Sequence, residues 1–152
     1  MANLIFDCKN KQTIERTCSI LKKGGIVVYP TDTLYGLGCD AKNESAIQRI
    51  NSLKGRDSPM SVLAPNKETV VDWLNIIESD QNIIMKKLGG ASTVIVPVVK
   101  GIVSELLMGD NNTLGIRIPN HEFCKNLSMV FPNPITTTSV NRTGQQAMID
   151  PQ

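Results

Sequence analysis

Short apolar runs alternate along the chain with stretches whose apolar residues recur every three or four positions. The short runs are rich in β-branched residues and several end at a proline, which is typical of strands in a buried sheet. The spaced stretches are typical of amphipathic helices. Strands are predicted over residues 26–29, 60–64, 93–99, 114–118 and 135–139, with a short edge strand over 4–6. Helices are predicted over residues 13–23, 43–53, 66–74, 80–88 and 122–127.

Polar and glycine residues at the ends of these segments support the boundaries. Asn43 and Asn66 stand where a helix N-cap is expected, because an Asn side chain accepts from the first free backbone N–H groups. Gly24-Gly25 and Gly89-Gly90 follow helices as stops. Pro97 interrupts a strand signal and favours an edge position or a bulge. The alternation of strands and helices predicts a single α/β domain over 1–152, without internal repeats or linkers.

Composition narrows the class of protein without identifying it. The chain has 152 residues, of which 41% are hydrophobic and 20% charged, as in ordinary one-domain globular proteins. A net charge of +2 is too small to indicate a nucleic-acid partner by itself. No apolar stretch approaches the roughly 20 residues that cross a bilayer, and the first ten residues do not resemble a signal peptide. We therefore expect a cytoplasmic protein with no membrane partner.

Cysteine and histidine usage argues against metal and triad chemistry. Cys8, Cys18, Cys39 and Cys124 form no CxxC pair, and His121 is the only histidine. A zinc site would need widely separated ligands, so we predict no metal site and four free thiols. A Ser-His-Asp or Cys-His mechanism is equally disfavoured.

Candidate chemistry begins directly after the strand at 26–29. Residues 30–38 read Pro-Thr-Asp-Thr-Leu-Tyr-Gly-Leu-Gly, which places hydroxyls, a carboxylate and a phenol at a strand end. Such loops carry ligands in α/β proteins, and Gly36 and Gly38 would let backbone approach a ligand. A turn that satisfies its own backbone is the alternative. Lys54-Gly55-Arg56 follows the 43–53 helix, either as a phosphate clamp or as simple charge capping of the helix end.

Two later segments add a cation and a row of hydroxyls. Arg117 lies in the otherwise apolar strand at 114–118, where it either points to solvent or holds a carboxylate in two hydrogen bonds. Residues 136–144 read Thr-Thr-Thr-Ser-Val-Asn-Arg-Thr-Gly, which is typical of a polar ligand shelf. Cations and hydroxyls without an activated nucleophile suit a reaction driven by positioning and by neutralising phosphate charge.

Four of these segments, in the same order, resemble the YrdC/YciO/YwlC family. Residues 28–38 are similar to the family's signature, and Lys54-Gly55-Arg56 to its Lys-x-Arg. Residues 115–119 are similar to its Arg-x-Pro strand, and residues 138–141 to its Ser-x-Asn motif. The resemblance implies a single-domain YrdC-like fold, a twisted mixed sheet with helices on both faces.

The family's best-known activity, threonylcarbamoyl-AMP synthesis, supplies the implied function. L-threonine, bicarbonate and ATP would give L-threonylcarbamoyladenylate and pyrophosphate, with Mg²⁺ accompanying the ATP. A downstream threonylcarbamoyl transferase would pass the group to tRNA, so this is a nucleotidyltransferase of tRNA processing. Double-stranded RNA is a further implied partner.

The resemblance also implies roles for single residues, of two kinds. The residues implied to hold the amino acid are Thr33, Arg117 and Thr137. The residues implied to hold the nucleotide and its phosphates are Lys54, Arg56, Thr113, Ser139 and Asn141. Lys54, Arg56 and Arg117 are the implied catalytic cations.

The sequence departs from the family pattern in three places. Residues 88–93 keep only the middle glycine and the threonine of the family's Trp-Pro-Gly-Pro-x-Thr. Leu63 stands where members often have a histidine, and after Gln152 the usual C-terminal extension is expected to be lacking. The alternative interpretation is therefore a catalytically reduced member that binds double-stranded RNA or a nucleotide.

Overall fold

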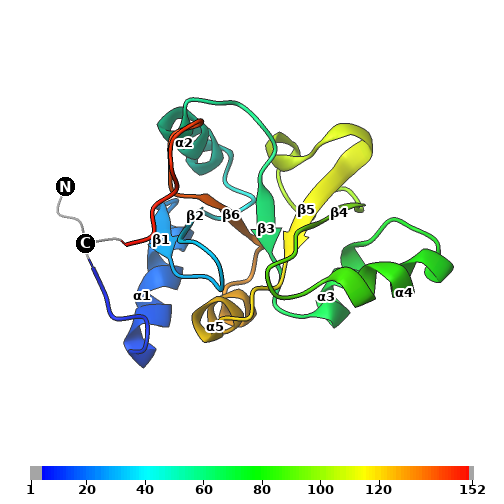
Figure 1. Ribbon diagram of the computed structural model, residues 1–152, viewed down its shortest axis with the longest axis horizontal. Coiled ribbons are helices and arrows are strands. Elements are labelled where there is room, and N and C mark those ends of the chain that lie inside the picture. Colours follow the sequence, from blue (N-terminus) through cyan, green and yellow to red (C-terminus); the bar gives the residue numbers. More distant parts are fainter. Residues whose placement is uncertain (1–4, 151–152) are drawn as a thin grey trace.

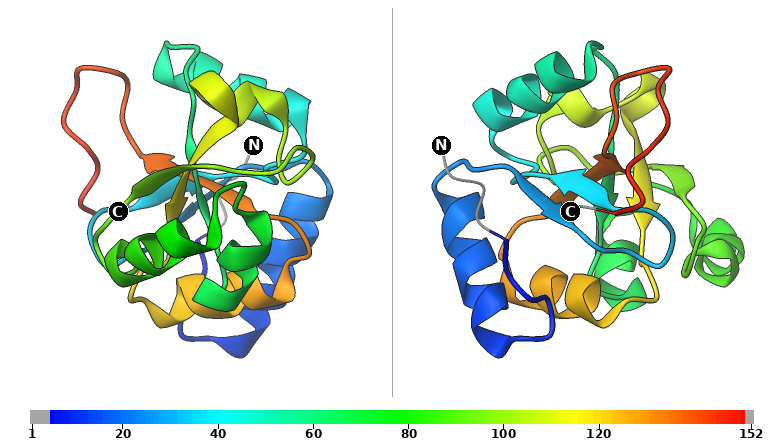
Figure 2. Two further views of the ribbon diagram at one scale, coloured as in Figure 1. Left: turned by 90° about the vertical axis from the view of Figure 1, so that its right-hand side faces the viewer. Right: turned by 60° about the vertical axis from the view of Figure 1, so that its left-hand side comes forward.

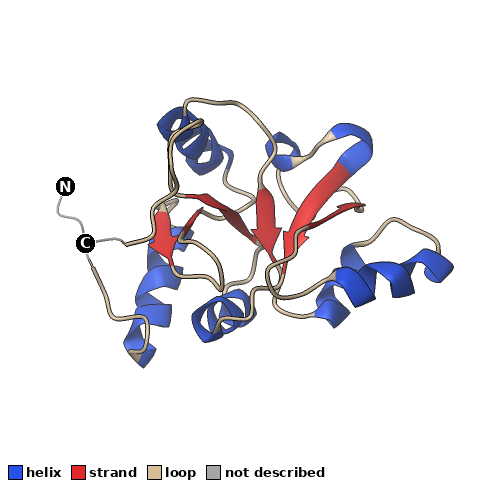
Figure 3. Cartoon of the chain, in the orientation of Figure 1, coloured by secondary structure: helices blue, strands red, loops and turns tan. Residues whose placement is uncertain are grey.

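Six strands form one mixed, open sheet in the computed structural model, which describes residues 5–150 (Figure 1, Figure 3). The strands are β1 Val27–Tyr29, β2 Gly36–Gly38, β3 Ser61–Leu63, β4 Val94–Pro97, β5 Thr113–Arg117 and β6 Ile135–Ser139. Their order across the sheet is β1-β2-β6-β3-β5-β4. The β3–β5 pair is parallel and the other neighbours are antiparallel. The predicted α/β fold with a mixed sheet is confirmed.

Helices cover both faces of this sheet, as the two side views show (Figure 2). The helices are α1 Lys11–Lys22, α2 Glu44–Lys54, α3 Lys67–Trp73, α4 Glu78–Lys87 and α5 Glu122–Val130, with short 3₁₀ turns at Glu105–Leu107 and Asp110–Asn112. None of those within residues 5–150 has the length and apolar character needed to cross a bilayer. Helices on both faces agree with the prediction.

Alternation along the strands divides the buried residues into two cores. Val62 packs in one core with residues of α2, including Ile47 and Ile50. The next residue, Leu63, packs in the other core with residues of α1 and α5, including Leu21 and Leu127. Successive side chains of a strand point to opposite faces, so a strand as short as β3 anchors both layers.

Polar caps fix the helix boundaries largely where the sequence predicts them. The Asn43 and Asn66 side chains accept hydrogen bonds from Ala46 N and Thr69 N, at 2.9 and 2.8 Å. The α2 helix ends at Gly55, whose φ of 68° is the left-handed conformation that glycine adopts without strain. His121 has a structural task as well, because its Nδ1 accepts from Phe123 N and caps α5.

Two local predictions differ from the structure, and one is confirmed. Gly36–Gly38 forms strand β2, although the sequence pattern indicates only a loop there. The predicted edge strand is absent over Ile5 and Phe6, while Leu4 lies outside the described residues. Pro97 does lie on an edge strand, since β4 pairs only with β5.

The Tyr29 ring explains why a Gly-Leu-Gly segment becomes a strand. Tyr29 is 1% exposed, and its hydroxyl donates to Thr136 O at 2.9 Å. A Cβ on Gly36 would lie 2.9 Å from this ring, and one on Gly38 would lie 2.3 Å from Thr136 O. The glycines therefore make room for Tyr29 and β6. The sequence-based interpretation assigned both glycines to the approach of a ligand; Gly38 has this packing role instead, while Gly36 also lines the cavity described below.

We expect Gly38→Ala to destabilise the protein by about 2–3 kcal/mol, because its Cβ would meet backbone that cannot move independently. The measurement is chemical denaturation with a two-state fit. Gly55→Ala is the control, since no described residue beyond its neighbours in the chain lies within 4 Å of its Cβ position and only backbone strain of about 1 kcal/mol is expected. Equal losses for the two variants would contradict the steric explanation.

Candidate active site

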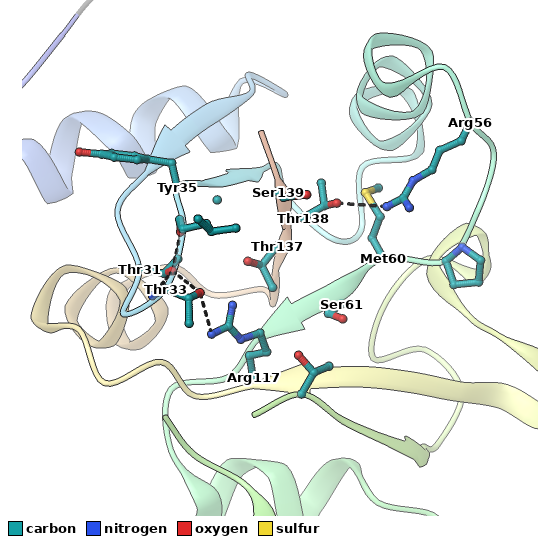
Figure 4. A pocket seen from close by; sticks show the side chains of 14 residues that line it. Thr31, Thr33, Tyr35, Arg56, Met60, Ser61, Arg117, Thr137, Thr138 and Ser139 are labelled. Carbon is teal, nitrogen blue, oxygen red and sulfur yellow. Dashed lines mark hydrogen bonds between the residues drawn. The ribbon is translucent and has the colours of Figure 1, made fainter. Parts of the chain in front are cut away.

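A cavity of about 260 Å³ opens where the β1–β2 loop, the segment after α2 and the strands β3, β5 and β6 meet (Figure 4). Its lining consists mainly of hydroxyl-bearing and cationic residues. The lining residues are Thr31, Thr33, Leu34, Tyr35, Gly36, Arg56, Pro59, Met60, Ser61, Thr93, Arg117, Thr137, Thr138 and Ser139. This list contains two guanidinium groups and no carboxylate. The cavity therefore suits an anionic ligand rich in oxygen atoms.

Arg117, the last residue of β5, is held by the β1–β2 loop. Its Nη2 lies 3.0 Å from Asp32 Oδ1 and 3.5 Å from Thr33 Oγ1. Both partners of this ion pair have side chains that are 14% exposed. Arg117 therefore neither points away into solvent nor carries an uncompensated charge.

Arg56 approaches the cavity from another side, through the segment that follows α2 (Figure 4). Its Nη2 donates to Thr138 Oγ1 at 3.1 Å. Among residues 5–150 no carboxylate lies within ion-pair distance of this guanidinium. One side of the cavity thus carries a compensated arginine and the other a free positive charge.

Lys54 lies behind the cavity wall rather than in it. The residue is 3% exposed, and its Nζ donates to Ser139 O at 2.6 Å, Asn141 O at 3.0 Å and Asn141 Oδ1 at 3.3 Å. Burial, followed by the nearby Arg56 charge, lowers the pKa of Lys54. In this structure the ammonium fixes the chain at and just beyond the end of β6.

Of the eight residues that the sequence assigns to the site, five line the cavity. They are Thr33, Arg56, Arg117, Thr137 and Ser139. Lys54 and Asn141 lie one hydrogen bond further back, because Asn141 Oδ1 contacts Ser139 Oγ at 2.5 Å. Thr113 is at the opposite end of β5 from Arg117, and its hydroxyl donates to Asp110 O at 2.9 Å. The individual roles of these residues stay predictions.

Four residues that the sequence assigns no role also belong to the site. Asp32 contacts Arg117, while Ser61, Thr93 and Thr138 add hydroxyls to the lining. Ser61 and Thr137 are register partners in β3 and β6. Asp32, Thr93 and Thr138 lie in segments that the sequence analysis quotes, while Ser61 lies only in the predicted strand at 60–64. Their convergence depends on strand order, which local pattern does not give.

The described residues offer no activated nucleophile or metal cluster near this cavity. The Cys124 thiol donates to Pro30 O at 3.1 Å, and burial raises its pKa to about 12. At neutral pH it is a thiol and not a thiolate. No group of three or more His, Cys, Asp or Glu side chains within 5–150 is placed to hold a metal ion. The arrangement can orient reactants and stabilise phosphate charge.

Sequence comparison relates the chain to one protein family. The family profile Sua5_yciO_yrdC, described as Telomere recombination, matches residues 19–152. A threonylcarbamoyl-AMP synthase of Idiomarina loihiensis is 34% identical over 129 residues, which are 82% of this chain and 69% of that protein. A threonylcarbamoyl-AMP synthase of Psychromonas ingrahamii is 32% identical, over 88% of this chain and 72% of that protein.

Solved structures share the fold. P. abyssi Sua5, crystallised in complex with L-threonine, superposes with a TM-score of 0.78 at 26% identity. The match covers 91% of this chain, which spans only 41% of the P. abyssi protein. E. coli YciO superposes with a TM-score of 0.79 at 24% identity, covering 90% of this chain and 67% of that one.

We expect Lys54→Met to destabilise the protein by about 2 kcal/mol, because two partly buried carbonyl groups would lose their donor. Thermal and urea denaturation measure the change. Lys87→Met is the matched control, since Lys87 also lies in the last turn of a helix but is exposed. A Lys54 variant as stable as the control would show that the ammonium does not fix the end of β6.

Proposed function

The chain belongs to the Sua5/YciO/YrdC family, and from this membership we propose that it is an L-threonylcarbamoyladenylate synthase. The observation that carries the proposal is a hydroxyl-rich cavity with two arginines, one paired with a carboxylate and one that has no carboxylate partner within residues 5–150. Named threonylcarbamoyl-AMP synthases of similar sequence support it. In enzyme class it would be a nucleotidyltransferase.

The Arg117 side of the cavity is proposed to take the amino acid. With one terminal nitrogen already on Asp32, the guanidinium is fixed in place and keeps donors for a carboxylate. Thr33 and Thr137 are near enough to line the same space. The neutralised pair suits a ligand of small net charge. The L-threonine bound in P. abyssi Sua5 is the matching ligand in a relative.

The Arg56 side is proposed to take the phosphates of ATP. Its uncompensated guanidinium can form paired hydrogen bonds with phosphate oxygens. Ser139 lines the cavity beside it, with Lys54 and Asn141 behind. Mg²⁺ would bind to the triphosphate itself, since Mg²⁺ is commonly held through substrate phosphates. Thr113, at the far end of β5, would contact only a part of the nucleotide outside the cavity.

The proposed reaction needs orientation more than acid–base chemistry. The threonine amine adds to the carbon of bicarbonate with loss of water and gives a carbamate. A carbamate oxygen then attacks the α-phosphorus of ATP, and the bond to the β-phosphate oxygen breaks to release pyrophosphate. Arginines held on two sides of one cavity would keep the two reactants adjacent and stabilise charge on the leaving group.

The product implies the proposed partners. Threonylcarbamoyl-adenylate is an activated acyl phosphate, so a downstream transferase must use it before water does. Its acceptor would be an adenosine of tRNA, which places the activity in the cytoplasm. The named relatives support this synthase over a catalytically reduced RNA-binding protein.

Incubation with L-threonine, bicarbonate and ATP-Mg²⁺ should release pyrophosphate in a threonine-dependent way. Enzyme-coupled pyrophosphate detection measures the rate, and mass spectrometry identifies the adenylate. Omission of threonine is the control. Equal pyrophosphate with and without threonine would contradict the proposal.

Arg117→Ala should lower kcat/KM for threonine by roughly 100-fold, because a charge-assisted pair is lost. Its KM for ATP should change by no more than about threefold. Arg56→Ala should show the reverse pattern, with a KM for ATP raised about tenfold. Steady-state kinetics with one substrate varied at a time separate the two effects. If both variants affected the same substrate, the two-sided assignment of the cavity would be wrong.

A further inference from the structure

Asp32, in the loop between β1 and β2, is held from two directions. Its Oδ1 lies 3.0 Å from Arg117 Nη2, and its Oδ2 accepts from the backbone N–H of Asn120 at 2.8 Å. Asn120 lies beyond the end of β5. The Asp32 side chain is 14% exposed and does not line the cavity. It therefore bridges two points of the chain and does not itself offer an oxygen to a ligand.

The contact with Asp32 fixes the guanidinium of Arg117 but leaves some of its N–H donors without a partner among the described residues. Nη2 is engaged with Asp32, and Nε is buried without a partner. Nη1 makes no hydrogen bond to any described residue. A guanidinium held at one corner has little freedom to rotate, so its free donors are already directed before a ligand arrives.

The loop that carries Asp32 is itself ordered around a hydroxyl. Thr31 Oγ1 donates to Leu34 O at 2.6 Å and accepts from Thr33 N at 3.1 Å. Immediately before the loop, Pro30 O accepts from the Cys124 thiol on α5. The carboxylate therefore projects from a braced turn, which makes it suited to fixing the position of a second side chain.

We propose that Asp32 is a positioning residue, which sets the Arg117 guanidinium for the carboxylate of the amino-acid substrate. This inference rests on the proposed function, because it assumes that an amino acid binds beside Arg117. Asp32 acts through Arg117 and makes no contact with the substrate. Its effect should fall on affinity for the amino-acid carboxylate, not on ATP.

Electrostatics alone predicts the opposite effect of an Asp32 substitution on threonine binding, so an experiment can distinguish the two explanations. Removing the Asp32 charge raises the positive potential at Arg117, so a substrate carboxylate would be attracted more strongly. Water in the open cavity screens that gain. Water does not reduce the effect of a misoriented guanidinium, because that effect comes from the geometry of its hydrogen bonds. The loss of guanidinium orientation should therefore weaken threonine binding more than the higher positive potential strengthens it.

The test compares two ligands that differ only at the carboxyl group. Isothermal calorimetry measures binding of L-threonine and L-threoninamide to the wild type, Asp32→Asn and Asp32→Glu. Asn keeps the size and one acceptor, while Glu keeps the charge but moves it by one methylene. Asp40→Asn is the matched control, since Asp40 also accepts from a backbone N–H, that of Lys42, and lies outside the cavity.

We expect Asp32→Asn to weaken L-threonine binding about tenfold and to leave L-threoninamide nearly unchanged. Asp32→Glu should lose part of the preference for L-threonine over L-threoninamide, and Asp40→Asn should lose none of it. In turnover, KM for threonine should rise while kcat at saturating threonine and KM for ATP stay within about twofold.

Two outcomes would overturn the positioning role. Equal weakening of both ligands would show a general structural effect of Asp32, and tighter threonine binding would show that charge dominates. Failure of the proposed function is separately visible. If the wild type binds threonine but releases no pyrophosphate, the proposed synthase activity is wrong. The comparison of L-threonine with L-threoninamide would still test the role of Asp32.

Discussion

The Tyr29 side chain holds together β1, β2 and β6, three of the strands that surround the cavity. Its ring fills the space where Gly36 and Gly38 carry no side chain, and its hydroxyl reaches Thr136 O in β6. These contacts bring β1, β2 and β6 into one layer, with the Thr31–Leu34 turn projecting between β1 and β2. Because Tyr29 is fully enclosed, burial raises the pKa of its phenol, and it stays a neutral donor. The site is thus built on a packed aromatic core, although its own surface is polar.

The two arginines of the cavity are tolerated for different reasons. Arg117 is largely enclosed, and a charge in that position requires a partner, which Asp32 supplies. Arg56 is exposed, so solvent and the Thr138 hydroxyl stabilise its charge and no carboxylate is required. The same difference in burial that satisfies electrostatics also gives the cavity two chemically distinct sides. Charge compensation in the fold and the chemical character of the cavity thus arise here from one distribution of charge.

Much of this architecture could be predicted from local pattern, and the failures have physical causes. The caps Asn43 and Asn66, the strand at β6 and the edge position of Pro97 follow from residue chemistry that acts within a few positions. Strand β2 could not be predicted, since a Gly-Leu-Gly segment has no strand propensity and is ordered by Tyr29 from another strand. The cavity residues were visible as motifs, but the pairing of Asp32 with Arg117 joins positions 85 residues apart. Long-range partners of this kind depend on strand order.

Lys54 shows how a cationic motif residue can support a cavity without lining it. Its ammonium holds two carbonyl groups and an amide oxygen at the end of β6, and Ser139 projects from that segment into the cavity. The ammonium engages these three oxygen atoms, and the Lys54 side chain itself does not line the cavity. A bound anion would then meet the Ser139 hydroxyl and the Arg56 guanidinium before any carbonyl oxygen. Motif residues can therefore shape a cavity through the backbone they fix, and lining it directly is only one of the ways in which they act.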